Sequence, residues 1–303
     1  MKNFESYLPE SNAIAEEGSI PKKIFMTWSS HQLSDAMYDN IQLWIKYNPD
    51  WELNLYDDQE CIEFIKSNFD KEVFDAYNNL FPTAYKADLF RYCLLYKYGG
   101  AYTDVKMVPL KPLAEIVSKD VDFMSAKDRL FNRFDFDGYI YQAFIYAKPQ
   151  HPFFEQAIKM IVDNSKSGYY GNDPLCPTGP GLLGKAVNIC CDRPETSKIE
   201  PGTNNINKFK FELLVHGDNA ITDVAGTPLI MDRYNEYKTE LHRDFELARR
   251  YNACWYIDAI YVGSHKPKSK TRYLSKSKLI YKIRYIYLIK IMKVFKKTSK
   301  ALR

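Results

Sequence analysis

The stretch from Pro82 to Lys106 constrains the fold of this chain more than any other part of the sequence. A helix is expected from about Pro82 to Lys97, since Pro82 suits the first turn of such a helix. Gly99 and Gly100 then end the helix, because glycine tolerates the backbone conformations that follow a helix end. The next residues, AYTDV, predict a buried strand. A helix that leads directly into a strand is typical of an α/β fold.

Strand and helix patterns alternate along the rest of the chain as well. Strands are expected over residues 24–28, 51–56, 101–105, 121–126, 139–147, 209–215 and 227–231. Helices are expected over residues 34–47, 58–67, 71–79, 82–97 and 234–250, from His151 onward, and from the turn at 177–181 to Cys190. This order predicts an α/β fold with a mostly parallel central sheet flanked by helices.

The length of 303 residues suits one large domain with a substantial core. We expect an N-terminal arm over residues 1–20, one domain over 21–265 and a tail over 266–303. The six cysteines, at positions 61, 93, 176, 190, 191 and 254, lack C-x-x-C and zinc-site spacing. They are expected to be reduced thiols, as in a cytosolic protein. The sequence shows neither a secretory signal nor an apolar run long enough to span a membrane.

The formal net charge of +4 hides a strong asymmetry between the body and the tail. Residues 1–258 hold all 38 acidic residues against 28 Lys and Arg, a net charge of −10, and residues 259–303 hold the other 14 basic residues. Within 278–300, most apolar and basic residues would fall on opposite sides of a helix, and Ile286, Ile289 and Arg284 are the exceptions. Such a helix over 270–303 favours binding to an anionic membrane surface. Docking on the acidic body or on a partner protein is the alternative, and nucleic acid is disfavoured because the expected catalytic face is not basic.

Three residues of the predicted 82–97 helix share one face, since Ala84, Asp88 and Arg91 follow at i, i+4 and i+7. Asp88 can accept hydrogen bonds from hydroxyl groups, and the guanidinium fork of Arg91 suits phosphate oxygens. Asp104 falls at the carboxyl end of the following strand, where open α/β sheets bind ligands. A lone Asp–Arg pair is otherwise a surface ion pair; only the combination at this spacing is unusual.

The combined pattern resembles glycosyltransferase family 32, the DXD-containing sugar transferases. The family pattern A-x-x-(S/A)-D-x-x-R-Y, followed by G-G-x-Y-x-D-x-D and P-L, stands here at residues 84–92, 99–106 and 109–113. IPKKIFMTW at 20–28, HPF at 151–153 and TGP at 178–180 match three further blocks. The resemblance implies a GT-A-like fold and a retaining transferase, similar to initiating α-1,6-mannosyltransferases and to the catalytic domain of large clostridial glucosylating toxins.

The resemblance also implies a nucleotide-sugar donor, either a UDP- or a GDP-sugar, with contacts along the two motifs. Trp28 is expected to stack on the base, and Tyr102 to pack on the nucleoside. Asp88 is expected to hold hydroxyl groups of ribose or sugar, and Arg91 to contact the sugar or the diphosphate. Asp104 corresponds to the first carboxylate of the DXD motif. Plain packing roles are the alternative for Trp28 and Tyr102.

Three more residues fall where the family places contacts to the sugar or the acceptor: Asp135, Asp137 and Gln142. Gln142 stands where an asparagine is common. Solvated loop positions are the alternative for the two aspartates, because they lie in a segment rich in phenylalanine and glycine.

Lys106 departs from the family, which has the second aspartate of the motif at this position. In the family, Mn²⁺ or Mg²⁺ neutralises the diphosphate leaving group. Three interpretations are open: the Lys106 ammonium replaces the metal, the metal is held by Asp104 with other groups, or the chain is an inactive relative. His265 in the segment YVGSH replaces an aromatic residue of the family and is a possible metal ligand with Asp104; an exposed loop histidine is the alternative.

The sequence thus predicts a retaining glycosyltransferase that acts on a glycan, polysaccharide or glycolipid acceptor. It is expected in the cytoplasm, on the inner face of a membrane. An inactive nucleotide-sugar-binding or scaffold protein at a membrane surface is the alternative. A nucleic-acid-binding protein would be supported by the basic tail alone.

Overall fold

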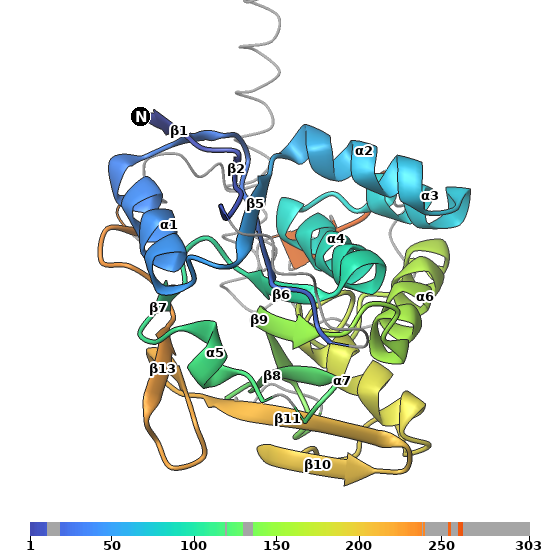
Figure 1. Ribbon diagram of the computed structural model, residues 1–303. Helices are drawn as coiled ribbons and strands as arrows, with labels where there is room; N and C mark the ends of the chain where they lie inside the picture. Colours follow the sequence, from blue (N-terminus) through green and yellow to red (C-terminus); the bar gives the residue numbers. More distant parts are fainter. Residues whose placement is uncertain are drawn as a thin grey trace, which may run out of the picture.

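The computed structural model describes residues 1–10, 19–118, 120–129, 136–237, 239, 254–255 and 260–262. A single large sheet of eleven strands crosses the molecule (Figure 1). Its strands are β2 (Ser6–Tyr7), β3 (Lys23–Thr27), β5 (Glu52–Tyr56), β6 (Gly100–Thr103), β7 (Val108–Pro109), β8 (Phe123–Lys127), β9 (Ile140–Ala147), β10 (Gly202–Ile206), β11 (Phe209–His216), β12 (Ala220–Thr222) and β13 (Pro228–Met231). Their order is β2-β5-β3-β6-β9-β8-β11-β12-β13-β7, and β10 pairs with β11. Two short strands, β1 (Lys2–Asn3) and β4 (Gln32–Leu33), form a separate pair.

The sheet is mixed. β3 is parallel to both β5 and β6, and β8 is parallel to β11, as the predicted parallel sheet requires. β9 runs antiparallel between β6 and β8, and β10 to β13 pair antiparallel because short turns join them. Since β9 is antiparallel to both of its neighbours, β3, β5, β6, β8 and β11 all point the same way. Their carboxyl ends therefore lie at one edge of the sheet.

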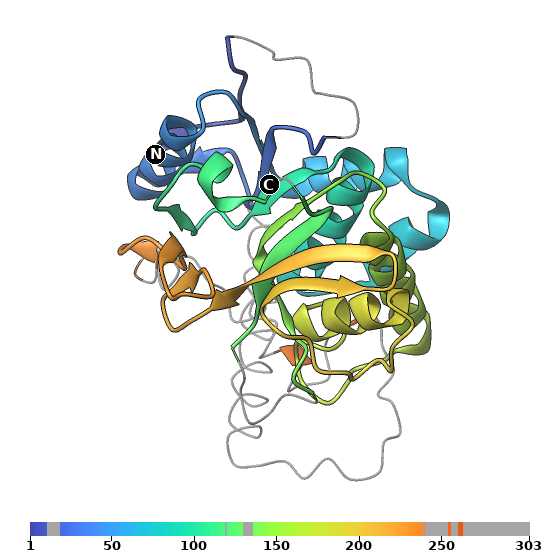
Figure 2. The ribbon, with the colours of Figure 1, turned by 60° about the horizontal axis from the view of Figure 1, so that its bottom comes forward.

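Helices cover both faces of the sheet (Figures 1 and 2). α1 (Asp35–Tyr47) and α5 (Leu113–Ile116) pack on one face, and the other face carries α2 (Asp58–Asn68), α3 (Lys71–Asn79), α4 (Thr83–Tyr98), α6 (Pro152–Ser167) and α7 (Pro180–Cys190). Alternate residues of β3 show the division: Ile24 and Met26 join the apolar cluster with α1, while Phe25 joins the cluster on the opposite face. The predicted α/β class is confirmed.

Most predicted elements begin and end within a few residues of the observed ones. The side chain of Ser34 accepts a hydrogen bond from the backbone N–H of Met37 and caps α1, and Asp57 and Glu60 form a capping box at α2. The first ten residues, expected as an arm, contribute β1 and β2. The helix predicted over 234–250 and the basic tail lie outside the described residues, apart from a few positions at the start of that helix.

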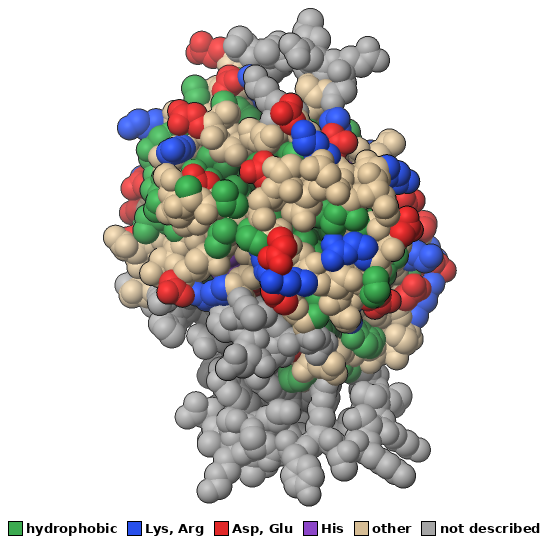
Figure 3. Space-filling view, turned by 90° about the horizontal axis from the view of Figure 1, so that it is seen from below, with side chains coloured by type: hydrophobic (Ala, Val, Ile, Leu, Met, Phe, Trp, Pro, Cys, Tyr) green, Lys and Arg blue, Asp and Glu red, His purple; other side chains and the backbone are tan. Residues whose placement is uncertain are grey.

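All six cysteines are thiols that are not joined in disulfides, as expected. Among the helices that the structure describes, none is long and apolar enough to cross a membrane. On the described part of the face seen in Figure 3, basic and acidic side chains are interspersed. That face therefore offers no extended basic surface of the kind that follows a nucleic-acid backbone.

Candidate active site

The topology marks one place on the sheet edge for ligand binding. From β3 the chain passes through α1 to β5 on one side, and then through α2, α3 and α4 to β6 on the other side of β3. Such a reversal of strand order opens a crevice at the carboxyl ends of the strands. Trp28 directly follows β3, and Asp104 directly follows β6. Two of the residues predicted for the donor, Trp28 and Asp104, therefore stand at this switch point.

Helix α4 carries two buried charged residues, Asp88 and Arg91, and Arg91 contacts Asp104 at this switch point. The helix is surrounded by the core, and nine of its side chains are buried, including Asp88 and Arg91 at 8% and 6% exposure. Because both side chains are buried, Asp88 and Arg91 do not form a surface ion pair, which was the alternative interpretation of their spacing. A buried charge requires partners, because removing it from water costs several kcal/mol.

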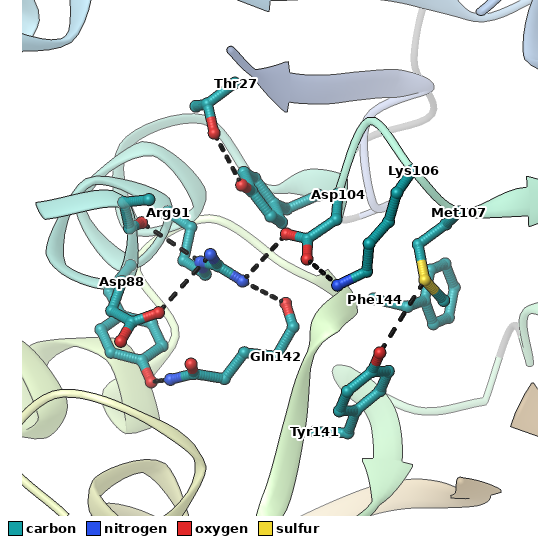
Figure 4. Close-up of polar contacts among 12 residues, drawn as sticks. Thr27, Asp88, Arg91, Asp104, Lys106, Met107, Tyr141, Gln142 and Phe144 are labelled. Atoms are coloured by element: carbon teal, nitrogen blue, oxygen red, sulfur yellow. Dashed lines mark hydrogen bonds and ion pairs between the residues drawn. The ribbon is translucent and has the colours of Figure 1, made fainter. Parts of the chain in front are cut away.

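Arg91 has such partners on every side (Figure 4). Its Nε donates to the carbonyl of Ala87 at 3.1 Å and its Nη1 to the carbonyl of Gln142 at 2.7 Å. It forms ion pairs with Asp88 at 3.5 Å and Asp104 at 3.4 Å, and lies over the ring of Tyr102 at 4.5 Å from the centroid. Burial would lower the pKa of Arg91, but Tyr102 and the two carboxylates outweigh it. The guanidinium is therefore a fixed positive charge.

Asp104 connects Arg91 with Lys106. The Nζ atom of Lys106 donates to Oδ2 of Asp104 at 2.8 Å, and both side chains are 24% exposed. Burial opposes the charge of Asp104, but Lys106 and Arg91 hold its pKa below the usual value. Burial alone would lower the pKa of Lys106, but the nearby charge of Asp104 outweighs burial and raises that pKa above its usual value. Asp104 and Lys106 thus form the more exposed end of the cluster, and Arg91 lies buried behind them between Asp104 and Asp88.

The side chains of Asp88 and Gln142 form hydrogen bonds with other residues of the protein interior. Oδ2 of Asp88 accepts a hydrogen bond from the hydroxyl of Thr178 at 2.8 Å. The side-chain amide of Gln142 donates to the hydroxyl of Tyr92 and to the carbonyl of Thr178. Gln142 therefore supports Arg91 with its carbonyl and ties β9 to the Thr178 loop with its side chain. The predicted contact of Gln142 with sugar or acceptor stays a prediction.

The two aromatic residues predicted for the nucleoside differ in exposure. Trp28 is partly buried against the cluster on the α1 face, and its backbone N–H donates to the carbonyl of Tyr56 at 3.1 Å. Tyr102 is 1% exposed, with its hydroxyl bonded to Thr27 at 2.9 Å and Arg91 over its ring. Trp28 keeps surface for a base. The nucleoside contact of Tyr102 stays a prediction, since in this structure its ring supports Arg91.

Of the remaining predicted site residues, the structure describes Asp137. Asp137 pairs with Lys127 at 2.6 Å and with Lys198 at 3.6 Å, and no contact places it within the Asp104 cluster in the described part of the chain. Asp135 and His265 lie outside the described residues.

The described residues around Asp104 do not fit a divalent cation. Both carboxylate oxygens of Asp104 face cations, one toward Arg91 and the other toward Lys106, and the second carboxylate of the motif is missing. Within the described ranges, one group could offer three ligands to a metal: His31, Asp57 and Glu60. Asp57 and Glu60 cap α2 and His31 pairs with Glu60 at 2.9 Å, so these groups already have partners.

Sequence reasoning missed a second polar cluster at the same edge. Asp128 follows β8, His216 ends β11 and Asp232 follows β13, and all three are buried and joined by hydrogen bonds. The rule that singled out Asp104, a polar residue at the carboxyl end of a predicted strand, also applies to Asp128 and His216. Nothing in the sequence indicates that they meet, because their partners come from separate strands.

Comparisons with known proteins agree with the motifs. Residues 34–123 match the family described as glycosyltransferase sugar-binding region containing DXD motif. The chain is 28% identical to an initiation-specific α-1,6-mannosyltransferase of Candida albicans, over 71% of this chain and 65% of that protein. It is 27% identical to inositol phosphoceramide mannosyltransferase 1 of Schizosaccharomyces pombe, over 60% of this chain and 54% of the relative. The chain thus spans less than two thirds of these relatives.

Two solved structures are similar at low identity. PaToxG glycosyltransferase has a TM-score of 0.43 and 16% identity, over 56% of this chain and 70% of that chain. The catalytic domain of alpha-toxin from Clostridium novyi has a TM-score of 0.33 and 11% identity, over 61% and 66%. The family match and the curated relatives, rather than these structures, support a transferase enzyme. The predicted resemblance to DXD-type glycosyltransferases is confirmed by the match over residues 34–123.

Proposed function

We propose that this chain is a retaining glycosyltransferase that moves a sugar from a UDP- or GDP-sugar to a glycan, polysaccharide or glycolipid. One observation carries the proposal. Arg91, Asp104 and Lys106 meet at the switch point of the sheet, within the segment that matches the sugar-binding region.

The charges of this cluster suit the departure of a nucleoside diphosphate. As the glycosidic bond breaks, the anomeric carbon gains oxocarbenium character and negative charge builds up on the diphosphate. Arg91 offers a guanidinium fork for phosphate oxygens, and Lys106 offers a point charge in place of a second carboxylate and its metal. Asp104 keeps both cations in place before the donor arrives. Such preorganised charges stabilise a transition state without reorganising during the reaction.

The neighbouring residues complete the donor site in this proposal. Trp28 stacks on the base from the end of β3, and Asp88 holds sugar hydroxyls next to Arg91. Because Asp88 already accepts the hydroxyl of Thr178, a sugar hydroxyl would approach its other oxygen, which faces Arg91 at 3.5 Å.

The acceptor and the location are inferred from the relatives and from the tail. The two relatives described above are named as mannosyltransferases. The name of the first contains an α-1,6 linkage, and the name of the second contains an inositol phosphoceramide. We therefore place the acceptor among glycans and glycolipids. The basic segment 270–303 would hold the enzyme on the anionic inner face of a membrane, in the cytoplasm.

A second candidate function is supported by Lys106 itself. A relative that has lost the second DXD carboxylate could bind nucleotide sugars without transferring them. Hydrolysis separates the two candidates, because an active transferase slowly releases sugar to water and a binding protein does not.

The test begins with a panel of nucleotide sugars, since a donor that binds the native state raises the melting temperature. With the donor so found, Asp104→Asn and Arg91→Lys are expected to reduce transfer and hydrolysis at least about 100-fold, because each removes a preorganised charge contact. Arg91→Lys keeps the charge but loses the fork, and Asp120→Asn, at an exposed position, serves as the control. Wild-type rates in a folded Asp104→Asn variant would refute the site.

A further inference from the structure

The second polar cluster of the sheet edge consists of Asp128, His216, Asp232 and Tyr141. The Nδ1 atom of His216 lies 2.6 Å from Oδ1 of Asp128, and its Nε2 atom lies 3.2 Å from Oδ2 of Asp232. The side chains of His216, Asp128 and Asp232 are only 4%, 7% and 8% exposed. The ring of Tyr141 stacks on the imidazole, with centroids 3.6 Å apart and planes 14° apart.

The two contacts of His216 favour its doubly protonated form. A neutral imidazole has one N–H and could donate to one of the two carboxylates, whereas an imidazolium donates to both. The other oxygen of Asp232, Oδ1, is buried and has no hydrogen-bond partner among the described residues, so Asp232 depends on His216. Burial would lower the pKa of His216, but hydrogen bonds to Asp128 and Asp232 raise it above the usual value.

Two connections lead from this cluster to Lys106. The first is Tyr141, which packs on His216 with one face and whose hydroxyl points to Sδ of Met107 at 4.0 Å (Figure 4). Tyr141 also lies near enough to Lys106 to contribute, after burial and Asp104, to the pKa of the ammonium group.

The second connection is the backbone that follows β13. Asp232 contacts His216 with its side chain, and two residues later the N–H of Tyr234 donates to the carbonyl of Lys106 at 3.1 Å. The backbone position of Lys106 and the surroundings of its side chain therefore both depend on groups that His216 holds.

We infer that His216 is a positioning residue for the site of the proposed function: as an imidazolium between Asp128 and Asp232, it holds Tyr141 and the 232–234 backbone against Lys106. It does not touch the donor. The inference rests on the proposed function only for its kinetic consequence, since the coupling from His216 to Lys106 is a property of the fold.

Loss of the imidazolium proton has a defined consequence. The groups that face His216 are Asp128 at the end of β8, Tyr141 from β9 and Asp232 after β13, and Lys106 lies beyond Tyr141. A neutral His216 retains the shorter bond to Asp128 and releases Asp232, whose buried side chain then has no hydrogen-bond partner among the described residues. The 232–234 backbone is thereby loosened, so turnover is expected to fall as the pH rises through the pKa of His216.

Nuclear magnetic resonance tests the coupling without any sugar transfer. The full chain is labelled with ¹⁵N, and its spectrum is compared with that of the His216→Gln variant. The imidazole signals that are missing from the variant are assigned to His216. Both ring nitrogens are expected to be protonated at neutral pH, with a midpoint above the ordinary value of about 6.5. The backbone amide of Tyr234 is expected to shift with the same midpoint. A neutral ring at pH 7, or an amide that does not follow the titration, would overturn the inference.

Kinetics test the consequence for the reaction. His216→Gln leaves one carboxylate facing the amide oxygen, so kcat is expected to fall roughly 10- to 100-fold with little change in the KM of the donor. His216→Gln is expected to lack the alkaline decline, and adding Asp232→Asn gives the amide oxygen a donor while the amide NH2 still faces Asp128, so the double variant is expected to recover most of the lost kcat. His151→Gln is the matched control, because His151 is a buried histidine that caps α6 away from this edge.

These outcomes separate the inference from the proposed function. If the wild type neither transfers nor hydrolyses any donor, the proposed function fails, and the resonance titration alone decides whether His216 positions Lys106. If the wild type is active and a folded His216→Gln variant retains its kcat, the inference is wrong while the proposed function stands.

Discussion

The buried position of Asp88 disfavours the ionised form of its carboxylate. Burial raises its pKa to about 6, although Arg91 and the hydroxyl of Thr178 favour the ionised form. The pKa in the folded state is therefore higher than in the unfolded chain. Such a group stabilises the fold below its unfolded pKa, and this stability is lost as the pH rises through the folded pKa. Asp88 is thus retained at neutral pH at a cost in stability, as expected of a residue kept for binding.

Asp88→Asn is expected to remove this cost while its amide oxygen still accepts the bond from Thr178. The variant should gain stability relative to the wild type as the pH rises from about 4 to about 6, by an amount on the order of 1–3 kcal/mol. Urea unfolding of both proteins between pH 4 and pH 8 measures the difference. A difference that does not change with pH would show that the pKa of Asp88 is not raised by burial. Donor binding by the variant should weaken at the same time.

At the scale of elements, the junction between α4 and β6 sets the position of Asp104. Gly99 caps α4 with φ 63° and ψ −166°, a conformation that only glycine adopts readily. A Cβ atom there would lie 2.6 Å from the backbone nitrogen of Pro149, and one at Gly100 would lie 2.7 Å from the carbonyl oxygen of Lys23. The two glycines therefore allow the start of β6 to pass close to the neighbouring backbone.

Gly99→Ala is expected to destabilise the protein by several kcal/mol, because backbone atoms cannot yield as a side chain can. Gly168→Ala is the control: Gly168 has φ 66° and ψ 35°, in the left-handed region that other residues adopt at small cost, and a Cβ atom added there would meet nothing within 4 Å. It should cost about 1 kcal/mol. Thermal unfolding compares the two variants. Equal losses would mean that the close approach at Gly99 is unimportant and that the positive φ alone matters.

The same junction shows which features of the fold can be predicted from the sequence. The start and end of α4 follow from Pro82 and the double glycine, and local spacing alone brings Asp88 and Arg91 to one face of the helix. The direction of β9 could not be predicted, since an apolar run does not indicate which way a strand crosses the sheet. The burial of Asp88 and Arg91 was also beyond local reasoning, because it depends on β9 and on the Thr178 loop.

The missed cluster around His216 has the same cause. Its four members come from β9, the end of β11 and the residues that follow β8 and β13, so the pairing of strands decides that they meet. A single aspartate after a predicted strand is common, and only the register of the sheet distinguishes Asp128 from a solvated turn residue.

At the scale of the whole molecule, the charge of the chain is divided between an acidic body and a basic tail. Removal of residues 270–303 is expected to release the protein from vesicles that contain anionic lipid, since each Lys or Arg near such a surface contributes about 1 kcal/mol. Donor hydrolysis should stay close to that of the full chain, because the described site residues all precede the tail. Vesicle sedimentation with anionic and neutral lipid measures the binding. Equal binding by the shortened chain would contradict the membrane proposal.

In the proposed function, Lys106 supplies the positive charge at the leaving group that a metal held by a second aspartate would otherwise provide. This role of Lys106 is tested by sugar release from the donor, measured against manganese concentration and in chelator, for the wild type, Lys106→Ala and Lys106→Asp. We predict that the wild type turns over in chelator and that Lys106→Ala is slower by roughly 100- to 1,000-fold at every metal concentration. Lys106→Asp should regain part of its activity with manganese alone, because the pair of carboxylates is restored. A wild type that is inactive in chelator, or a Lys106→Ala variant that is as fast as the wild type, would contradict the claim.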